Sequence, residues 1–185
     1  MKIAITGHTD GVGKNIYEKL LKEFNVIGLS RTNGYDIKNV DKIIEQIEGC
    51  DVFINNAFQQ NYQTLLFEKL FYSWKYSTKL IINMNSSCVY DSSDWNPPYA
   101  NSKKDFRDVS MNIIRNNIDK KVRVTNLYPS TLSTHTGFEK LNKIDTNYIS
   151  DIVLWLISQP KEVEIREMSI YCTTLEKEFK IDKLI

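Results

Sequence analysis

Cysteine and histidine are scarce in this chain, and their scarcity excludes several kinds of site. The three cysteines, Cys50, Cys88 and Cys172, are odd in number and form no C-x-x-C pair, so the sequence predicts neither a disulfide framework nor a zinc site. The two histidines, His8 and His135, lie far apart, and no set of metal ligands accompanies either of them. We therefore expect free thiols in the core and no bound metal.

An excess of charge of one sign and long apolar runs are also missing. The chain carries 24 basic and 23 acidic residues, for a formal net charge of +1, and no basic stripe dominates, so nucleic acid is not an expected partner. No uncharged apolar run is long enough for a membrane span, and the apolar stretch before Gly7 is too short for a signal peptide. We expect a cytoplasmic protein that binds neither nucleic acid nor membranes.

Short apolar runs alternate with segments of helical period along the chain. The expected strands cover 3–5, 26–29, 52–54, 80–84, 122–127 and 168–171, and the expected helices cover 16–24, 40–47, 65–75, 99–116 and 149–157. Asn96-Pro97-Pro98 gives the start signal of the longest helix. The strands are apolar on both faces, as parallel strands between two helix layers must be. The pattern predicts a single α/β domain over 1–185, with a Rossmann-type doubly wound parallel sheet in three α/β/α layers.

A glycine-rich loop, Thr6-Gly7-His8-Thr9-Asp10-Gly11-Val12-Gly13, joins the first expected strand to the first helix. Glycine permits positive φ and a close approach of the backbone to a ligand. The helix N-terminus offers free N–H groups and a positive dipole end to a pyrophosphate. The loop follows the carboxyl end of the first strand, where such sheets bind dinucleotides. The sequence favours a dinucleotide site over the alternative, a glycine turn that only closes a strand–helix unit.

Five motifs, in order along the chain, resemble those of the short-chain dehydrogenase/reductase family. The glycine loop matches T-G-x-x-x-G-x-G, Asn55-Asn56-Ala57-Phe58 is similar to N-N-A-G, Ile81–Ser86 to I-V-N-I-S-S, Tyr99–Lys103 to Y-x-x-S-K, and Pro129–Thr134 to P-G-x-x-x-T. Phe58 and Ser130 each stand where the family has glycine. On these motifs the chain is identified as a compact member of the family, with a nicotinamide dinucleotide as cofactor.

The resemblance implies a catalytic set of Ser86, Tyr99 and Lys103. Tyr99 would be the general acid that protonates a carbonyl oxygen, and the base in the reverse direction. Lys103 would favour the phenolate by its charge and hydrogen-bond the nicotinamide ribose, while Ser86 would orient the substrate oxygen. A Tyr/Lys pair four residues apart is common on surface helices, and it gains its meaning here from the preceding strand that ends in Ser86.

The family often adds an asparagine from the preceding helix to a proton relay. Asn61 is the candidate, because it stands where the expected helix over 65–75 begins. A solvated loop amide is the alternative interpretation of Asn61, since the stretch from Asn55 to Ser86 is shorter than usual for the family.

The same resemblance assigns a larger set of residues to the cofactor: Thr6, Gly7, Thr9, Asp10, Gly11, Val12, Gly13, Ser30, Arg31, Asp36, Ile37, Asn55, Asn56, Ala57, Lys103, Pro129, Thr131 and Thr134. The second strand ends in Ser30-Arg31 without a carboxylate, and this hydroxyl and guanidinium favour the 2′-phosphate of NADP(H) over NAD(H). Asp10 argues the other way, because a carboxylate there could repel the phosphate. Asp36 is expected at the adenine, or else as a turn or helix-capping residue.

These implications lead to an NAD(P)(H)-dependent oxidoreductase that transfers a hydride between the nicotinamide and a small carbonyl or alcohol substrate. The main alternative is a redox sensor or regulatory module that binds NAD(P) without turnover, motivated by Phe58 and Ser130. A sugar-nucleotide epimerase or reductase is less favoured, because the chain lacks the larger C-terminal substrate domain of such enzymes. The short segment 135–146 predicts an open, shallow site.

Two further expectations concern the surroundings of the catalytic set. Cys88, Tyr90 and Trp95 lie between Ser86 and Tyr99, where they either shape the substrate pocket or pack under the loop. Family members usually assemble through the Tyr/Lys helix and the helix before it, and the chain is therefore expected to form a homodimer. The preceding helix carries an apolar stripe that is wide enough to serve both core and interface: Leu66, Phe67, Leu70, Phe71 and Trp74.

Overall fold

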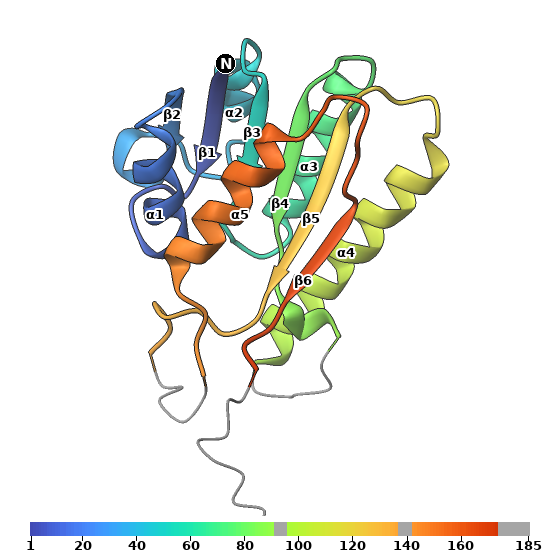
Figure 1. The fold of residues 1–185 in the computed structure, drawn as a ribbon. Helices are drawn as coiled ribbons and strands as arrows, with labels where there is room; N and C mark the ends of the chain where they lie inside the picture. Colours follow the sequence, from blue (N-terminus) through green and yellow to red (C-terminus); the bar gives the residue numbers. More distant parts are fainter. Residues whose placement is uncertain (91–95, 137–141, 174–185) are drawn as a thin grey trace, which may run out of the picture.

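The computed structural model describes residues 1–90, 96–136 and 142–173 (Figure 1). Its strands are β1 (Lys2–Thr6), β2 (Asn25–Leu29), β3 (Val52–Asn55), β4 (Leu80–Met84), β5 (Arg123–Pro129) and β6 (Glu167–Ile170). Its α-helices are α1 (Gly11–Leu20), α2 (Val40–Ile47), α3 (Tyr62–Trp74), α4 (Pro97–Asn116) and α5 (Thr146–Ser158), and two 3-10 helices are η1 (Arg31–Asn33) and η2 (Ser87–Val89). Every strand and helix expected from the sequence is present. The largest shift is in α1, which covers 11–20 instead of the expected 16–24, and the other elements shift by at most three residues at their ends.

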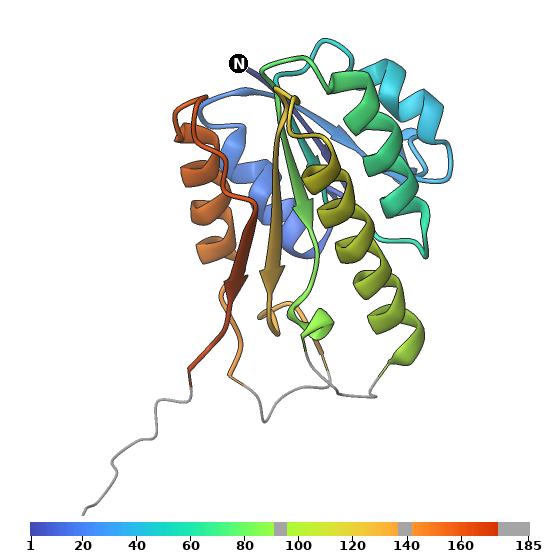
Figure 2. The same ribbon diagram turned by 90° about the vertical axis from the view of Figure 1, so that its right-hand side faces the viewer.

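The six strands form one parallel sheet in the order β2-β1-β3-β4-β5-β6. Helices α1 and α5 cover one face of the sheet, and α2, α3 and α4 cover the other (Figures 1 and 2). The predicted Rossmann-type sheet in three layers is therefore confirmed.

Two apolar cores hold the layers together, and β1 to β5 contribute to both, whereas β6 contributes Met168 and Ile170 to the core under α1 and α5. Ile3 and Ile5 of β1 pack in the core under α1 and α5, whereas Ala4 between them packs in the core under the other three helices. Successive side chains of a strand point to opposite faces of the sheet. This explains why the strands are apolar at consecutive positions rather than at alternate ones.

The order of the strands places a crevice at the end of β1. The chain forms β2 on one side of β1 and then crosses to form β3 on the other side. The carboxyl ends of the strands point to the lower edge of the sheet in Figure 1. Open α/β sheets bind ligands at such a topological switch point, outside the carboxyl ends of the strands.

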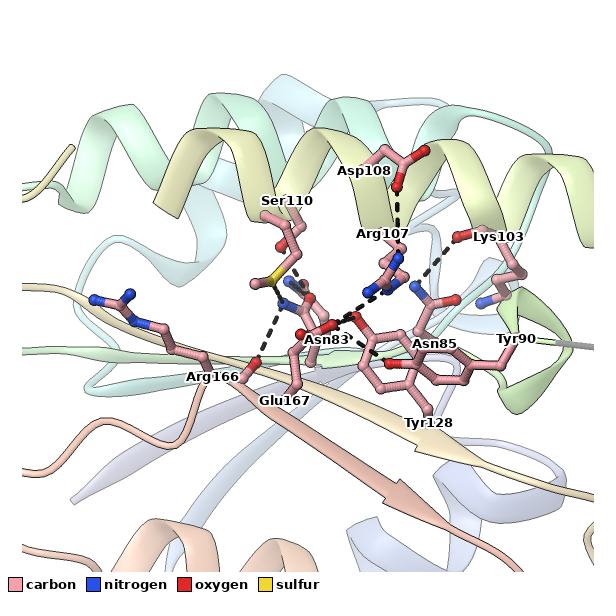
Figure 3. Close-up of polar contacts among 12 residues, drawn as sticks. Asn83, Asn85, Tyr90, Lys103, Arg107, Asp108, Ser110, Tyr128, Arg166 and Glu167 are labelled. Atoms are coloured by element: carbon pink, nitrogen blue, oxygen red, sulfur yellow. Dashed lines mark hydrogen bonds and ion pairs between the residues drawn. The ribbon is translucent and has the colours of Figure 1, made fainter. Parts of the chain in front are cut away.

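A row of polar side chains crosses the sheet within this apolar setting. Asn55 of β3 is in register with Asn83 of β4, which is in register with Asn126 of β5, which is in register with Glu167 of β6. Asn55 donates to the Asn83 amide oxygen at 3.3 Å, and Asn83 donates to the Asn126 oxygen at 3.1 Å. Ser110 of α4 adds a second donor to Asn126 at 2.9 Å (Figure 3). The amides are buried and bond one another across three strands.

The cysteines fit the expectation of buried free thiols in part. Cys50 and Cys88 are buried free thiols, but Cys172 is exposed just after β6. Within residues 1–90, 96–136 and 142–173, no cluster of His, Cys, Asp or Glu is suited to holding a metal ion. In the same part of the chain, no helix has the length and apolar character needed to cross a membrane.

Candidate active site

The glycine loop after β1 is a tight turn that only glycine can make at several points. Gly7 and Gly11 have φ values of +71° and +55°, in the left-handed region that other L-residues rarely adopt. A Cβ on Gly13 would lie 2.1 Å from the Gly7 carbonyl oxygen and 2.4 Å from Asn56 Nδ2. The first turn of α1 is thus packed directly against the end of β1 and the loop after β3.

Asn56 and Ala57 fasten this loop to the end of β3. The Asn56 side-chain amide donates to the backbone oxygens of Thr6 at 3.0 Å and Gly7 at 3.2 Å. The backbone N–H groups of Asn56 and Ala57 both donate to Thr6 Oγ1 at 3.0 Å. The residues that resemble N-N-A-G therefore support the glycine loop directly, as a backbone scaffold.

Asp10 serves as the N-cap of α1. Its Oδ1 accepts the backbone N–H of Gly11 at 2.7 Å, which satisfies one of the free donors at the helix start. Thr9 and Asp10 are exposed, and Val12 packs partly against the core under α1. The capping role gives Asp10 a structural reason to be acidic that is independent of any cofactor.

The end of β2 folds back on itself through η1. Ser30 is buried, its Oγ lies 2.7 Å from Thr32 Oγ1, and its backbone N–H donates to Asn33 Oδ1 at 2.9 Å. Arg31 is exposed at this point. Further along, Asp36 Oδ1 accepts the N–H of Lys38 at 2.9 Å.

Asp36 therefore has the turn role that was its alternative assignment, and its contact with adenine stays a prediction. Ile37, which follows it, is buried in the core under α2.

The loop after β5 faces the glycine loop from the opposite side. A Cβ on Gly11 would lie 3.9 Å from Thr134 Oγ1, so the two loops come close together. Pro129 ends β5, and the Thr131 carbonyl accepts the N–H of Ile144 at 2.8 Å. Loop residues from both sides of the switch point thus border the same crevice.

Ser86 and Tyr99 meet at the end of β4. Ser86 follows β4 and caps η2, and its backbone N–H donates to Asn85 Oδ1 at 3.0 Å. Asn96 caps α4 by accepting the N–H of Tyr99 at 3.3 Å, which places Tyr99 in the first turn of the helix. The Ser86 hydroxyl lies close enough to the Tyr99 phenol to act on its pKa.

Burial raises the pKa of Tyr99 to about 12, although the nearby Ser86 hydroxyl acts in the opposite direction. The phenol is therefore protonated at neutral pH. In this state Tyr99 is a proton donor rather than a base.

Lys103 lies one turn further along α4 and is almost completely enclosed. Its Nζ donates to Gln63 Oε1 at 2.7 Å and to the Met84 carbonyl oxygen at 3.0 Å. Desolvation lowers the pKa of Lys103 to about 7, while the two acceptors favour the charged amine. Lys103 therefore changes its charge close to neutral pH.

Gln63, and not Asn61, is the polar residue of α3 that contacts the catalytic set. Asn61 is exposed at the start of α3 and its side chain makes no capping bond. Gln63 is 1% exposed, and its Nε2 donates to the Asn55 carbonyl at 2.8 Å and the Met84 carbonyl at 3.0 Å. We therefore add Gln63 to the candidate set, and the role of Asn61 stays a prediction. Helical spacing in the sequence could have predicted that Gln63 is buried, because it lies on the same helix face as the buried residues three and four positions further on.

Tyr90 belongs to a polar cluster next to the site. Its ring packs against Tyr128 at 5.3 Å, and the Arg107 guanidinium lies 5.0 Å above it. Glu167 accepts the Tyr128 hydroxyl at 2.9 Å and Arg107 Nε at 3.3 Å (Figure 3). These contacts join η2, α4, β5 and β6, so Tyr90 has a packing role. Cys88 is buried beside it, and Trp95 lies outside the described residues.

The buried lysine is expected to make stability depend on pH. Because its folded-state pKa of about 7 lies below the ordinary value of 10.5, the unfolded chain binds more protons than the folded protein between these values. The stability of the wild type relative to Lys103→Met should therefore rise by at most about 1.4 kcal/mol per pH unit above neutrality. Urea unfolding of both proteins at about pH 6.5 and about pH 8.5 measures this difference. A difference that did not change with pH would contradict the lowered pKa.

Comparisons with known proteins give structural relatives only. No protein-family model and no curated protein matches the sequence. The 3-ketoacyl-(acyl-carrier-protein) reductase of Brucella melitensis, solved with NADH, is 16% identical with a TM-score of 0.77, over 91% of this chain and 96% of that one. The alcohol dehydrogenase of Thermococcus sibiricus, solved with 5-hydroxy-NADP, is 19% identical with a TM-score of 0.71, over 92% and 96%.

A short-chain dehydrogenase/reductase from Vibrio parahaemolyticus is 12% identical with a TM-score of 0.73, over 91% of this chain and 98% of that one. At these identities the likeness is one of fold, and it extends over nearly the whole of both chains. The protein therefore has the fold of the short-chain dehydrogenases/reductases, as its motifs predict.

Proposed function

We propose that this protein is a nicotinamide-dependent oxidoreductase that interconverts a small carbonyl compound and its alcohol. The observation that carries the proposal is the proximity of Ser86 to Tyr99, with Lys103 one helical turn away. This set lies at the carboxyl edge of the sheet, as does the glycine loop. The structural neighbours solved with NADH and 5-hydroxy-NADP support a nicotinamide cofactor.

The residues present fit such a cofactor. Gly13 leaves no room for a side chain, so the backbone of the loop and the first turn of α1 form a close cradle. The N–H groups of that first turn have no partner within the helix and suit a pyrophosphate. Ser30, Arg31, Asp36 and Ile37 would border the adenosine half. Asn55, Asn56, Ala57, Pro129, Thr131 and Thr134 would border the nicotinamide half.

In the proposed reaction the nicotinamide, when bound, supplies or accepts a hydride. Ser86 orients the substrate oxygen and Tyr99 transfers a proton to it. Since the pKa of Tyr99 is raised to about 12, the phenol holds its proton at neutral pH and suits the reduction of a carbonyl. In the opposite direction the charge of Lys103 would favour the phenolate. Gln63 holds the Lys103 ammonium against β4 while this occurs.

The proposal is tested by titrating the protein with NADPH and NADH and following nicotinamide fluorescence. We expect tighter binding of NADPH, because the exposed Arg31 guanidinium and Ser30 can pair with a 2′-phosphate. Arg31→Ala should weaken NADPH about 10–100-fold and leave NADH nearly unchanged, since a hydrogen bond to a charged group contributes about 1.5–3 kcal/mol. Arg115→Ala, at the far end of α4, is the matched control.

Each outcome of this titration bears on a different part of the proposal. A wild-type preference for NADH would preserve the catalytic set but contradict the role of Arg31. Failure to bind either nucleotide would contradict the proposed function itself. Binding of NADPH without turnover of any small carbonyl would instead favour a regulatory module, for which the ring of Phe58 over Lys103 is the supporting observation.

We further propose that the protein is a homodimer that pairs through the outer surface of α3 and α4. The apolar stripe of α3 from Leu66 to Trp74 is buried within the chain, so the pairing surface must use the residues beside it. Leu65 and Tyr72 are 36% and 60% exposed. Light scattering at micromolar concentration should give twice the mass of the chain, and Tyr72→Glu should reduce it to that of one chain. A wild type with the mass of one chain would contradict the dimer.

A further inference from the structure

The ammonium of Lys103 is enclosed by groups from several parts of the fold. Gln63 of α3 and the Met84 carbonyl of β4 accept two of its protons. The ring centroid of Phe58 lies 5.0 Å from Nζ, and that of Tyr99 lies 5.7 Å away. The titratable groups that face the ammonium are Tyr99 on α4 and the thiol of Cys88 on η2. Among the described residues, the other groups in contact with the amine, Gln63, the Met84 carbonyl and Phe58, carry no charge.

Phe58 forms the solvent-facing side of this enclosure. Its side chain is 41% exposed, whereas Gln63 and Met84 are 1% and 4% exposed and Lys103 itself is 3% exposed. The ring also meets Tyr99 edge to face, with centroids 4.9 Å apart and an interplanar angle of 73°. A single aromatic side chain thus touches both members of the Tyr99–Lys103 pair and separates the amine from water.

The loop between β3 and α3 holds the ring in this place. On one side of Phe58, Ala57 donates its N–H to Thr6 Oγ1 at 3.0 Å. On the other side, Ser102 Oγ of α4 donates to the Gln60 carbonyl at 2.9 Å. Gln60 has a φ of +48°, which is unfavourable for a residue with a side chain. The loop is therefore hydrogen-bonded to α4 while the backbone of Gln60 stays in an unfavourable conformation.

We propose that Phe58 is a positioning residue: its ring is a movable cover that shields Lys103 and orients Tyr99, and an entering nicotinamide nucleotide must displace it. Two of the three ammonium protons point to acceptors inside the protein, and the ring covers the remaining approach. A ribose hydroxyl can therefore bond to Lys103 only after the ring has moved. This part of the proposal rests on the proposed function, whereas the shielding of the amine does not.

The shielding is tested without any cofactor, by following the titration of Lys103 in protein labelled with 13C at the lysine ε-carbon. The Lys103 resonance is identified by its loss in Lys103→Met. In Phe58→Ala, water reaches the amine, and the midpoint should rise by about one pH unit toward the ordinary value. Phe58→Leu keeps an apolar cover without an aromatic face, so its midpoint should not rise. Equal midpoints in the wild type and Phe58→Ala would overturn the shielding.

The displacement is tested by the affinity for NADPH. Phe58→Ala should bind NADPH about tenfold more tightly than the wild type, because the edge-to-face and cation–π contacts of the ring no longer have to be broken. Phe58→Trp, with a larger ring, should bind it more weakly. Equal or weaker binding by Phe58→Ala would overturn the displacement. If the wild type bound neither NADPH nor NADH, the proposed function would fail, and the lysine titration would still decide on the cover.

Discussion

Tyr99→Phe is expected to lower kcat for carbonyl reduction by about 10²–10⁴-fold, the usual contribution of a general acid. The substitution removes only the phenol oxygen, which lies near Ser86 and would donate the proton. The ring that packs against Phe58 is retained. The dissociation constant for NADPH should therefore stay within about twofold of the wild-type value, since the substitution removes no group assigned to nucleotide binding.

Steady-state kinetics with a panel of small aldehydes and ketones, next to a fluorescence titration with NADPH, measures the two effects separately. Ser86→Ala is the useful companion, because it removes the neighbouring hydroxyl and leaves the phenol in place. It should lower kcat by less than Tyr99→Phe does. Wild-type turnover in Tyr99→Phe would remove Tyr99 from the reaction and, with it, the main support for the proposed mechanism.

Gly13→Ala is expected to damage both the fold and the nucleotide site. The added methyl group would stand 2.1 Å from the Gly7 carbonyl oxygen and 2.4 Å from Asn56 Nδ2. A backbone oxygen held by its own loop cannot move aside cheaply, so the turn and the start of α1 must shift. Overpacking of this kind costs about 1–3 kcal/mol or more. Thermal unfolding should show the lower stability, and NADPH affinity should fall about 100-fold or more, because the cradle for the pyrophosphate is displaced.

Two other glycines give matched controls for the same substitution. Gly49→Ala places its methyl group in open space, with Lys2 Nζ as the nearest atom at 3.9 Å, and should change neither property. Gly11→Ala meets only Thr134 Oγ1 at 3.9 Å but sits at a φ of +55°. Its cost should therefore be the backbone strain alone, about 1–2 kcal/mol. A Gly13→Ala protein that matched Gly49→Ala in stability and affinity would show that the loop is not packed as described.

The order of strands and helices could be predicted from the sequence, because the helix caps and the glycine loop agree with the alternation of apolar runs and helical periods along the chain. Asn96 followed by Pro97 predicts the start of α4. In the structure Asn96 caps the helix there, because its side-chain oxygen accepts the N–H of Tyr99. Because the cap fixes the first turn, the direction in which Tyr99 and Lys103 leave the helix was also implied by the sequence. The glycine loop was readable for a similar reason, since its conformation is set by residues that are neighbours in the chain.

Contacts between residues distant in the chain were not readable in the same way. Motif spacing points to Asn61, yet the side chain that reaches Lys103 comes from Gln63, because the orientation of α3 depends on how its apolar stripe packs. Phe58 looked like the loss of a family glycine, and only the structure places its ring over Lys103. The motif indicates only that the Asp10 carboxylate would repel a 2′-phosphate, and the bond that Asp10 accepts from the Gly11 N–H adds a capping role.

The aligned amides of the sheet have a consequence for how neighbouring strands find their register during folding. The apolar residues of β3 and β4 are nearly interchangeable, so hydrophobic pairing alone would tolerate several offsets. Asn55, Asn83 and Asn126 can bond one another only when the three strands are aligned as observed. An offset of one residue would turn each amide into the opposite core without a partner, at a cost of about 1–3 kcal/mol for each group. The row therefore disfavours misaligned sheets, and it adjoins the candidate site, because Asn55 also donates to the Gln63 carbonyl at 3.0 Å.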